Sequence, residues 1–251
     1  MQAFYALATE DYRQLVGARD WGADLSRHAV DDRVRLLDVA CGSGKFPTAL
    51  LAAGLAEQPV VEVDLLDPSA FSIAEARGAL APPFIAAAEH EVFLQDFSAT
   101  GYDVAWATHA LYALPPGELA TGVAKMVAAL RPGGFGAVAQ ASSQSHYLTF
   151  YDAYRASFAP DATPYTDAEG VAAALREAGA PVEVQVLHYR TGTSDRAVAE
   201  GFLQRCAFDD VVSLDQMENS EALGDYLAGC RGPTGAYEFQ HEAHLMTWRQ
   251  P

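Results

Sequence analysis

Apolar runs alternate with segments of helical period from about residue 34 to residue 190. The apolar runs have the length of buried strands and lie at residues 33–40, 59–66, 91–95, 102–108, 135–141 and 182–189. The segments of helical period between them predict helices over residues 45–53, 68–80, 116–130 and 167–179. Alternation of this kind predicts an α/β fold with a doubly wound, mostly parallel sheet and helices on both faces.

The segments outside this repeat predict a helical lid and one more strand. Lid helices are expected in residues 1–30 and over residues 142–158, 195–207 and 214–228. Residues 237–248 (YEFQHEAHLMTW) alternate between apolar and polar positions, which predicts a seventh, antiparallel last strand. No repeat or low-complexity linker divides the chain. We therefore expect a single Rossmann-like domain over 1–251, with a lid (1–30), a ligand-binding core (31–141) and lid helices with the last two strands (142–251).

Composition narrows the class of protein. Half of the 251 residues are hydrophobic and 20% are charged, as in an ordinary globular protein. The N-terminus has no basic segment before an apolar one, and no run is long enough to span a membrane, so we expect a cytoplasmic protein without membrane contact. The three cysteines show no CxxC spacing, which predicts neither a disulfide framework nor a metal site.

The net charge of −17 bears on partners. Such a charge repels phosphate backbones, so nucleic acid is disfavoured as a partner. It is compatible with a cationic amine as substrate, although acidity also serves solubility. We expect a small-molecule substrate and a monomer or homodimer.

A glycine-rich turn after the first strand is the main candidate ligand site. Cys41-Gly42-Ser43-Gly44 lets the backbone approach a ligand and begins a helix whose free N–H groups bind a phosphate or a carboxylate. Asp67 ends the second strand, some twenty-odd residues on, where a carboxylate accepts hydrogen bonds from a ribose diol. Asp38 lies in the first strand and has two candidate roles, ligand contact or capping of the turn. The sequence has no GxxxxGK[ST], which argues against an NTPase.

Two further motifs lie along the same predicted sheet. Asp96-Phe97 follows the third strand and offers an acceptor and an aromatic face for an adenine, and LRPGG (130–134) precedes the fifth strand. Together with LDVACGSGKF and the Asp-Pro after strand two, these motifs resemble class I S-adenosylmethionine (SAM)-dependent methyltransferases across residues 34–141. The resemblance implies SAM as cofactor, bound by Asp38, Gly42, Ser43, Gly44, Asp67, Asp96 and Phe97. Ala40 departs from the family pattern, which usually has its first glycine there.

A narrower similarity concerns the substrate side. DLLDPSAFSIAEAR, WATHALYALPP and YLTFYDAYRASF occur in an order similar to that of the histamine N-methyltransferase-like group. That group builds a substrate lid from N-terminal helices, the segment after strand five and the C-terminal strand. The similarity implies a small substrate with an amine among the candidates, but it does not imply histamine.

Candidate catalytic residues lie after the fourth strand. His109 follows that strand directly, on the side expected to face the methyl group, and is a candidate substrate contact or base. Tyr112 lies one helical turn further and offers its π face to a sulfonium. A hydrogen-bonded loop histidine is the alternative for His109.

Candidate substrate contacts lie in the lid. Tyr147 and Tyr151 are four residues apart and share one helix face, although ordinary lid packing explains them equally well. Tyr12 and Asp20 match the group's aromatic and acidic pocket positions within one residue. Gln240 and His241 point to opposite faces of the last strand, so we expect one of the polar residues of this strand to reach the pocket.

The sequence thus predicts a SAM-dependent methyltransferase that methylates a nitrogen or oxygen of a small molecule by in-line displacement. Two alternatives stay open. The protein could use SAM differently, by transferring or cyclising its aminocarboxypropyl arm, or it could bind SAM without catalysis.

Overall fold

A mixed, seven-stranded sheet runs through the protein. The computed structural model describes residues 2–251. The order across the sheet is β3-β2-β1-β4-β5-β7-β6, and β7 runs antiparallel to both of its neighbours. The strands are β1 (Arg33–Val39), β2 (Val60–Leu66), β3 (Phe84–His90), β4 (Tyr102–Thr108), β5 (Leu130–Ala141), β6 (Glu183–Thr193) and β7 (Tyr237–Arg249). The predicted Rossmann-like fold with an antiparallel last strand is confirmed.

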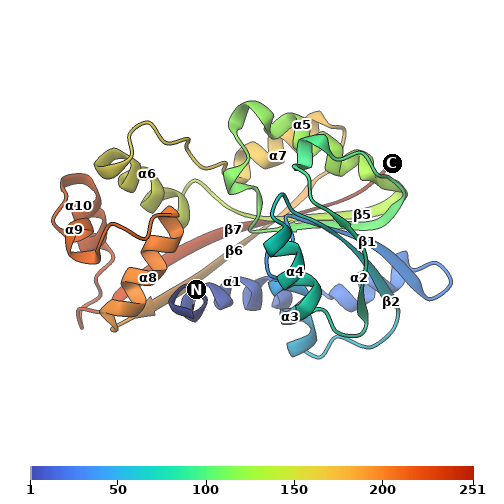
Figure 1. The fold of residues 1–251 in the computed structure, drawn as a ribbon, viewed down its shortest axis with the longest axis horizontal. Coiled ribbons are helices and arrows are strands. Elements are labelled where there is room, and N and C mark those ends of the chain that lie inside the picture. The colour runs from blue at the N-terminus through green and yellow to red at the C-terminus, as the bar shows by residue number, and fades with distance from the viewer. Residues whose placement is uncertain (1) are drawn as a thin grey trace.

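Helices cover both faces of the sheet. Figure 1 shows α5 and α7 on one side and α1 and α3 on the other. None of the described helices has both the length and the apolar character needed to cross a bilayer. The helices are α1 (Gln2–Gly17), α2 (Trp21–His28), α3 (Lys45–Ala52), α4 (Ala70–Ala79), α5 (Pro116–Ala129), α6 (His146–Phe158), α7 (Ala168–Glu177), α8 (Arg196–Ala207), α9 (Leu214–Glu218) and α10 (Glu221–Gly229), with 3-10 turns η1 (Leu94–Asp96) and η2 (Leu111–Ala113).

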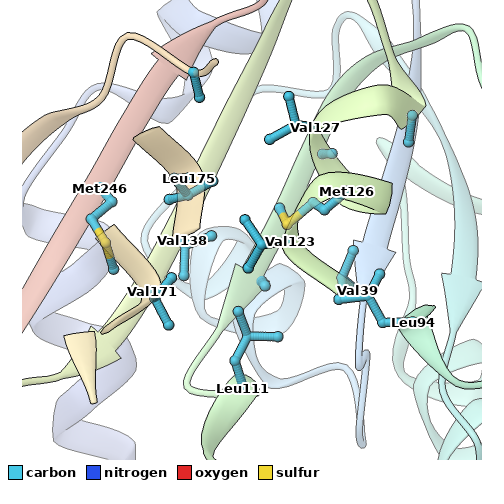
Figure 2. Packing of buried hydrophobic residues seen from close by; sticks show 14 of the residues in the cluster. Val39, Leu94, Leu111, Val123, Met126, Val127, Val138, Val171, Leu175 and Met246 are labelled. Carbon is cyan, nitrogen blue, oxygen red and sulfur yellow. The ribbon is translucent and has the colours of Figure 1, made fainter. Parts of the chain in front are cut away.

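The apolar face of α5 forms one half of the core. Val123, Met126 and Val127 recur at helical spacing and are buried against the sheet (Figure 2). Val171 and Leu175 of α7 extend the same layer. A second apolar layer, on the other face, is formed by the sheet with α1 to α4. Burial on both faces makes the central strands continuous apolar runs, which is why the sequence predicts them well.

A third apolar cluster lies at one end of the molecule, where the long strands β6 and β7 reach α6, α8, α9 and α10 (Figure 1). Phe150 of α6, Phe202 of α8 and Phe239 of β7 are fully buried in it, and Leu7 of α1 packs against them. This cluster, which we call the lid core, fixes α1 and the later helices beside the carboxyl ends of the parallel strands.

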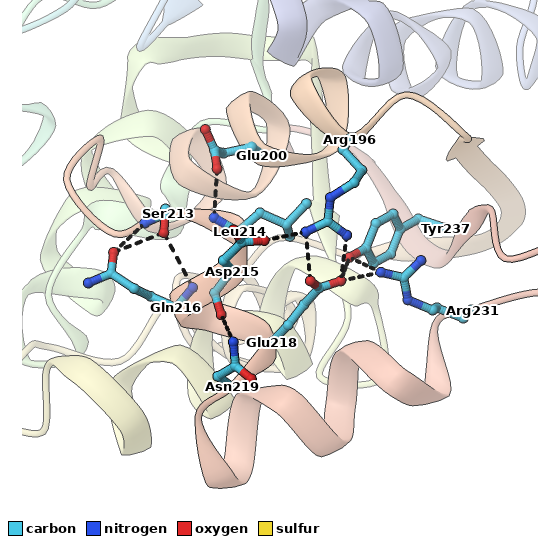
Figure 3. Close-up of polar contacts among 10 residues, drawn as sticks. All are labelled: Arg196, Glu200, Ser213, Leu214, Asp215, Gln216, Glu218, Asn219, Arg231 and Tyr237. Carbon is cyan, nitrogen blue, oxygen red and sulfur yellow. Dashed lines mark hydrogen bonds and ion pairs between the residues drawn. The ribbon is translucent and has the colours of Figure 1, made fainter.

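Ion pairs hold the far edge of the lid together (Figure 3). Glu218 at the end of α9 accepts a hydrogen bond from Arg196 of α8 at 2.7 Å and also bonds Arg231 and the hydroxyl of Tyr237. The hydrogen bond from Arg196 contributes most to lowering the pKa of Glu218 to about 2. One carboxylate therefore connects α8, α9, the loop after α10 and β7.

Two predicted elements are wrong in position. The third strand was expected over 91–95 but lies at Phe84–His90. It is an edge strand (FIAAAEH) whose residues after Phe84 are exposed or half-buried, and the apolar residues Val92 and Phe93, which suggested a strand further on, lie exposed in the following loop. The helix expected over 214–228 is divided into α9 and α10, with Asn219 and Ser220 between them, and Oγ of Ser220 donates a hydrogen bond back to the carbonyl of Met217 in α9.

Candidate active site

Two adjoining cavities lie at the carboxyl ends of β1 and β4. The larger has a volume of about 330 Å³ and the smaller about 110 Å³. They share five lining residues: Tyr5, Tyr12, Ala40, Gly42 and His109. β1 has β2 on one side and β4 on the other, so the chain reverses its direction of winding here. Open α/β sheets bind their ligands at this point.

The β1–α3 turn forms the floor of the smaller cavity. Ala40, Gly42 and Gly44 have φ of +50°, +52° and +68°, a left-handed region that disfavours side chains. A Cβ on Gly44 would approach the Cα of Ala76 in α4 to 3.2 Å, so this glycine also allows close helix packing. Ala40 adopts the left-handed conformation in spite of its methyl group.

Asp67, at the end of β2, is tied to this turn. Its Oδ2 accepts a hydrogen bond from the N–H of Gly42 at 3.2 Å, and its Oδ1 accepts one from Ser69 at 2.9 Å. The side chain is buried yet lines the larger cavity. The two backbone donors therefore fix the carboxylate beside the cavity, with lone pairs left for a ligand.

Asp38 lines the smaller cavity from within β1. Burial raises its pKa to about 7, and the nearby charge of Asp67 acts in the same direction. Among the described residues neither Asp38 nor Asp67 forms an ion pair. Two buried carboxyl groups without an ion-pair partner favour a positively charged ligand.

Helix α1 covers the turn from above. The hydroxyl of Tyr5 lies 3.2 Å from Oγ of Ser43, and Nζ of Lys45 lies 4.2 Å from the centre of the Tyr5 ring. The predicted contribution of the N-terminal helices to the site thus comes from α1, and Ser43 lies at the cavity as expected.

His109 and Tyr112 stand together between the two cavities. Nδ1 of His109 lies 3.0 Å from the hydroxyl of Tyr112, which in turn accepts a hydrogen bond from the N–H of Ala141 at 3.1 Å. Burial lowers the pKa of His109 to about 4, so the imidazole is neutral at pH 7. His109 has φ of +51°, a strained conformation of the kind found at functional sites.

Tyrosine rings line the larger cavity. Tyr112 lies 6.1 Å from Tyr147 and 5.9 Å from Tyr165, centre to centre, with 50° between the planes in both pairs. Tyr12 of α1 packs edge-on against His109 at 6.0 Å. Tyr12, His109, Tyr112 and Tyr147, all expected near the substrate, are therefore brought together at one cavity.

Asp11 of α1 is the residue that sequence reasoning missed. It is 4% exposed, lines the larger cavity, and accepts hydrogen bonds from Tyr147 at 2.6 Å and Tyr189 at 2.8 Å. Burial raises its pKa to about 7. A signal existed, because Leu7, Asp11 and Leu15 recur every four residues and place a carboxylate on the buried face of the helix.

Three of the expected substrate residues lie away from the cavity. Asp20 is exposed, and its carboxylate accepts a hydrogen bond from the N–H of Ala23 at the start of α2. Gln240 points to the opposite face of β7 and is exposed. Tyr151 is buried behind the cavity wall, where it stacks on Tyr165 at 3.6 Å.

His241 lies on the inner face of β7 but one layer behind the cavity. Its ring stacks on Tyr189 at 4.9 Å and its Nε2 lies 2.8 Å from Oγ1 of Thr191. Alternation along β7 therefore directs His241 inward and Gln240 outward, which the sequence left open. The inward residue supports Tyr189 and, through it, Asp11.

The two residues expected beside an adenine, Asp96 and Phe97, do not line either cavity. Asp96 is exposed in η1 beyond the end of β3. Phe97 is 3% exposed and packs into the core against Tyr102, so its ring does not line either cavity.

One further polar group lies outside the cavities. The side chains of Glu169, Glu242 and His244 each have an atom able to coordinate a metal, and these atoms lie within 4.8 Å of one another. Glu169 accepts a hydrogen bond from the N–H of Ser143, and Nε2 of His244 lies 3.3 Å from Glu242. The protein's own donors thus engage both carboxylates, and we propose no metal here.

An open α/β sheet with a glycine turn after β1 and a fixed carboxylate after β2 is the arrangement in which such folds bind nucleotides. Residues 36–134 match the model of a methyltransferase domain. Residues 36–134 therefore form a methyltransferase domain, and its cofactor is SAM. A search of curated proteins found no match to the sequence.

Solved structures share the fold at low sequence identity. A protein of Bacillus halodurans C-125 assigned as a methyltransferase has a TM-score of 0.65 and 16% identity, over 92% of this chain and 99% of its own. The N-methyltransferase NodS of Bradyrhizobium japonicum, solved with S-adenosyl-L-homocysteine, has a TM-score of 0.50 and 15% identity, over 92% and 84%. The [4+2]-cyclase SpnF has a TM-score of 0.53 and 18% identity, over 95% and 80%.

The residues present fit this cofactor. SAM carries a positive sulfonium and a positive ammonium group. Asp38 and Asp67 place two buried carboxyl groups beside the turn, and among the described residues neither forms an ion pair, although Lys45 also lines the smaller cavity. The left-handed turn at Gly42 brings backbone N–H groups close to the same space.

Proposed function

We propose that the enzyme transfers the methyl group of SAM to a nitrogen or oxygen atom of a small molecule bound in the larger cavity. The observation that carries this proposal is the junction of the two cavities at Tyr12 and His109. A volume of about 330 Å³ suits a small molecule rather than a polymer. The net charge of −17 further disfavours a nucleic-acid substrate.

The turn and its neighbouring carboxylates would hold the cofactor. When bound, SAM supplies an electrophilic methyl group on a sulfonium sulfur. Asp67 would accept hydrogen bonds from the ribose, and Asp38 and the turn from Gly42 to Gly44 would hold the amino-acid end. Asp96 would contact the adenine from the exposed η1 turn, while Phe97 supports that turn from the core.

His109 would orient the substrate rather than act as the base. The Tyr112 hydroxyl accepts the N–H of Ala141, so its own proton is directed to Nδ1 of His109. This assignment leaves the ring proton on Nε2, where it can donate a hydrogen bond to a substrate atom. A neutral imidazole adds no positive charge next to a sulfonium.

The aromatic wall would exclude water and fix the acceptor. Tyr112, Tyr147 and Tyr165 come from three different segments, and each ring packs against a neighbour that restricts its movement. Positioning of two reactants in one cavity contributes up to about 7–11 kcal/mol to lowering a barrier. Methyl transfer from a good leaving group therefore needs little more from the protein than orientation and a dry site.

We further propose that the reaction takes place in the cytoplasm, and that an amine acceptor, as in the histamine N-methyltransferase-like group, is the leading substrate class. The competing use of SAM, transfer or cyclisation of its aminocarboxypropyl arm, would occupy the same site and release a different nucleoside.

Calorimetric titration with S-adenosylhomocysteine tests the cofactor site. We expect one binding site in wild-type protein and at least a tenfold loss of affinity in Asp67→Ala. Asp195→Asn is the control, because Asp195 is an exposed cap of α8 and asparagine caps helices equally well. Full affinity in Asp67→Ala would overturn the assignment of Asp67, and no binding to wild-type protein would overturn the proposed function.

A further inference from the structure

A buried carboxylate with no cationic partner lies in the wall of the substrate cavity. Asp11 is 4% exposed, and each of its oxygens accepts one tyrosine hydrogen bond, Oδ2 from Tyr147 and Oδ1 from Tyr189. The two tyrosines come from α6 and β6, so separate elements converge on this one group. Each carboxylate oxygen retains a further lone pair for a ligand.

No described cation compensates this charge. Burial is the largest influence on the pKa of Asp11, and the only charged neighbour that acts on it is Glu10, which is negative. Arg205 lines the same cavity, but its guanidinium lies 5.2 Å over the ring of Phe208, which is 63% exposed at the cavity edge. The protein itself thus leaves Asp11 unpaired, and a buried unpaired carboxylate is costly unless a ligand compensates it.

The rings around Asp11 suit a cation as well. Tyr112, Tyr147 and Tyr165 form a tilted series of aromatic faces in the same cavity, and Tyr12 adds a fourth ring. Aromatic faces attract ammonium groups through their negative π charge, and the attraction is larger where water is excluded. A neutral alcohol would gain neither of these attractions.

We infer that the substrate is a cationic amine and that Asp11 is the counter-ion that recognises its ammonium group. Asp11 then accepts one proton from that group, which frees the nitrogen lone pair that attacks the methyl group. This inference rests on the proposed function and specifies its substrate class. Tyr147 and Tyr189 are positioning residues for Asp11, because they hold its carboxylate in one orientation.

Affinity for the ammonium group should therefore depend on pH, because only the ionised form of Asp11 attracts it. The other titratable groups that face Asp11 stay in one state between pH 6 and pH 8. Burial raises the pKa of each neighbouring tyrosine and of the Cys206 thiol, and it lowers the pKa of the two nearby histidines, to about 4 and about 3. These groups are Tyr12, Tyr112, Tyr147, Tyr189, Cys206, His109 and His241. The pKa of Glu10 is lowered by its bond to Arg13, so Glu10 is ionised throughout. Arg205 also lines the cavity.

A matched pair of small probes tests the inference. Benzylamine and benzyl alcohol have nearly the same size, but only the amine is a cation at pH 8. Their affinities are measured by calorimetry or ligand-observed NMR in the presence of S-adenosylhomocysteine. We expect wild-type protein to prefer the amine at least tenfold at pH 8, and the preference to decline as the pH falls from 8 to 6. Asp11→Asn should abolish the preference and its pH dependence, whereas Asp195→Asn should retain both.

A second variant and the affinity for S-adenosylhomocysteine distinguish failure of this inference from failure of the proposed function. Tyr189→Phe removes a hydrogen bond that favours the charged form of Asp11. The variant should therefore still prefer the amine to the alcohol, but the preference should decline at a higher pH than in the wild-type protein. A wild-type protein that binds S-adenosylhomocysteine but shows no preference for the amine would overturn this inference and leave the proposed function intact. A preference that survives in Asp11→Asn would equally overturn it. A failure to bind S-adenosylhomocysteine at all would instead contradict the proposed function.

Discussion

Replacement of Asp11 by asparagine should stabilise the ligand-free protein at pH 8. Burial raises the pKa of Asp11 from 3.8 to about 7, so the native protein holds a proton that the unfolded chain releases. The free energy of unfolding therefore falls as the pH rises from about 4 to about 7, because the unfolded state releases the proton first. Asp11 therefore opposes folding fully above pH 7 and not at all below pH 4.

The magnitude comes from the same shift. The difference of about three pKa units corresponds to an upper limit of about 4 kcal/mol at pH 8, at 1.36 kcal/mol per unit. Asparagine restores one tyrosine bond well, but it leaves the other tyrosine proton without its acceptor, which costs about 1 kcal/mol. We thus expect Asp11→Asn to gain about 2–3 kcal/mol in free energy of unfolding at pH 8, and about 2 kcal/mol less than that at pH 5.

Urea unfolding of the variant and wild-type protein at pH 5 and pH 8, without cofactor, measures both values. Asp38 also has a raised pKa, but its contribution is present in both proteins and cancels. Asp195→Asn should differ from wild type by less than about 0.5 kcal/mol at both pH values, because both residues cap a helix well. An Asp11→Asn protein no more stable than wild type at pH 8 would refute the reasoning that Asp11 is a buried charge kept for a ligand.

Further predictions concern the turn, the lid and the substrate contact. Ala40→Gly should raise the free energy of unfolding by about 1 kcal/mol in urea, because Ala40 has φ of +50°, and a loss of stability would contradict this. Gly44→Ala should lower it by about 2 kcal/mol and weaken binding of S-adenosylhomocysteine, since its Cβ would crowd Ala76, and an unchanged protein would argue against close packing there. Glu218→Gln should lower stability by about 1–2 kcal/mol at pH 7, after a discount for partial exposure. The difference should disappear as the pH falls toward the lowered pKa of about 2, and thermal melts at several pH values check it. Tyr112→Phe should reduce kcat about 10–100-fold with little change in KM for SAM, and an unchanged kcat would show that His109 needs no partner.

The cofactor half of the site could be predicted because its determinants are local. The turn after β1 depends on small residues in sequence, and Asp67 depends on the end of the next strand. Gly42, Ser43 and Asp67 therefore lie at the cavities as expected. Asp96 and Phe97 were exceptions, since a residue in or beside a short 3-10 turn points to the ligand, to solvent or to the core, and the sequence does not specify which.

The substrate half depends on contacts between distant segments. Asp11 and Asp20 are both aspartates of the N-terminal segment. Only Asp11 follows Leu7 at the helical spacing that places it on the buried face, whereas Asp20 caps α2. Tyr165 lies in a loop without periodicity, and its place in the cavity depends on Tyr151 behind it. Long-range packing of the lid core selects these residues, so a local pattern does not reveal them.

The central claim is that a methyl group passes from SAM to a small molecule in the joined cavities. The most direct measurement incubates the protein with SAM that carries a deuterated methyl group and with a small-molecule extract, followed by mass spectrometry of products and nucleoside. We predict a low-molecular-weight amine that carries the deuterated methyl group, formed together with S-adenosylhomocysteine. Release of methylthioadenosine without any methylated small molecule would contradict the account.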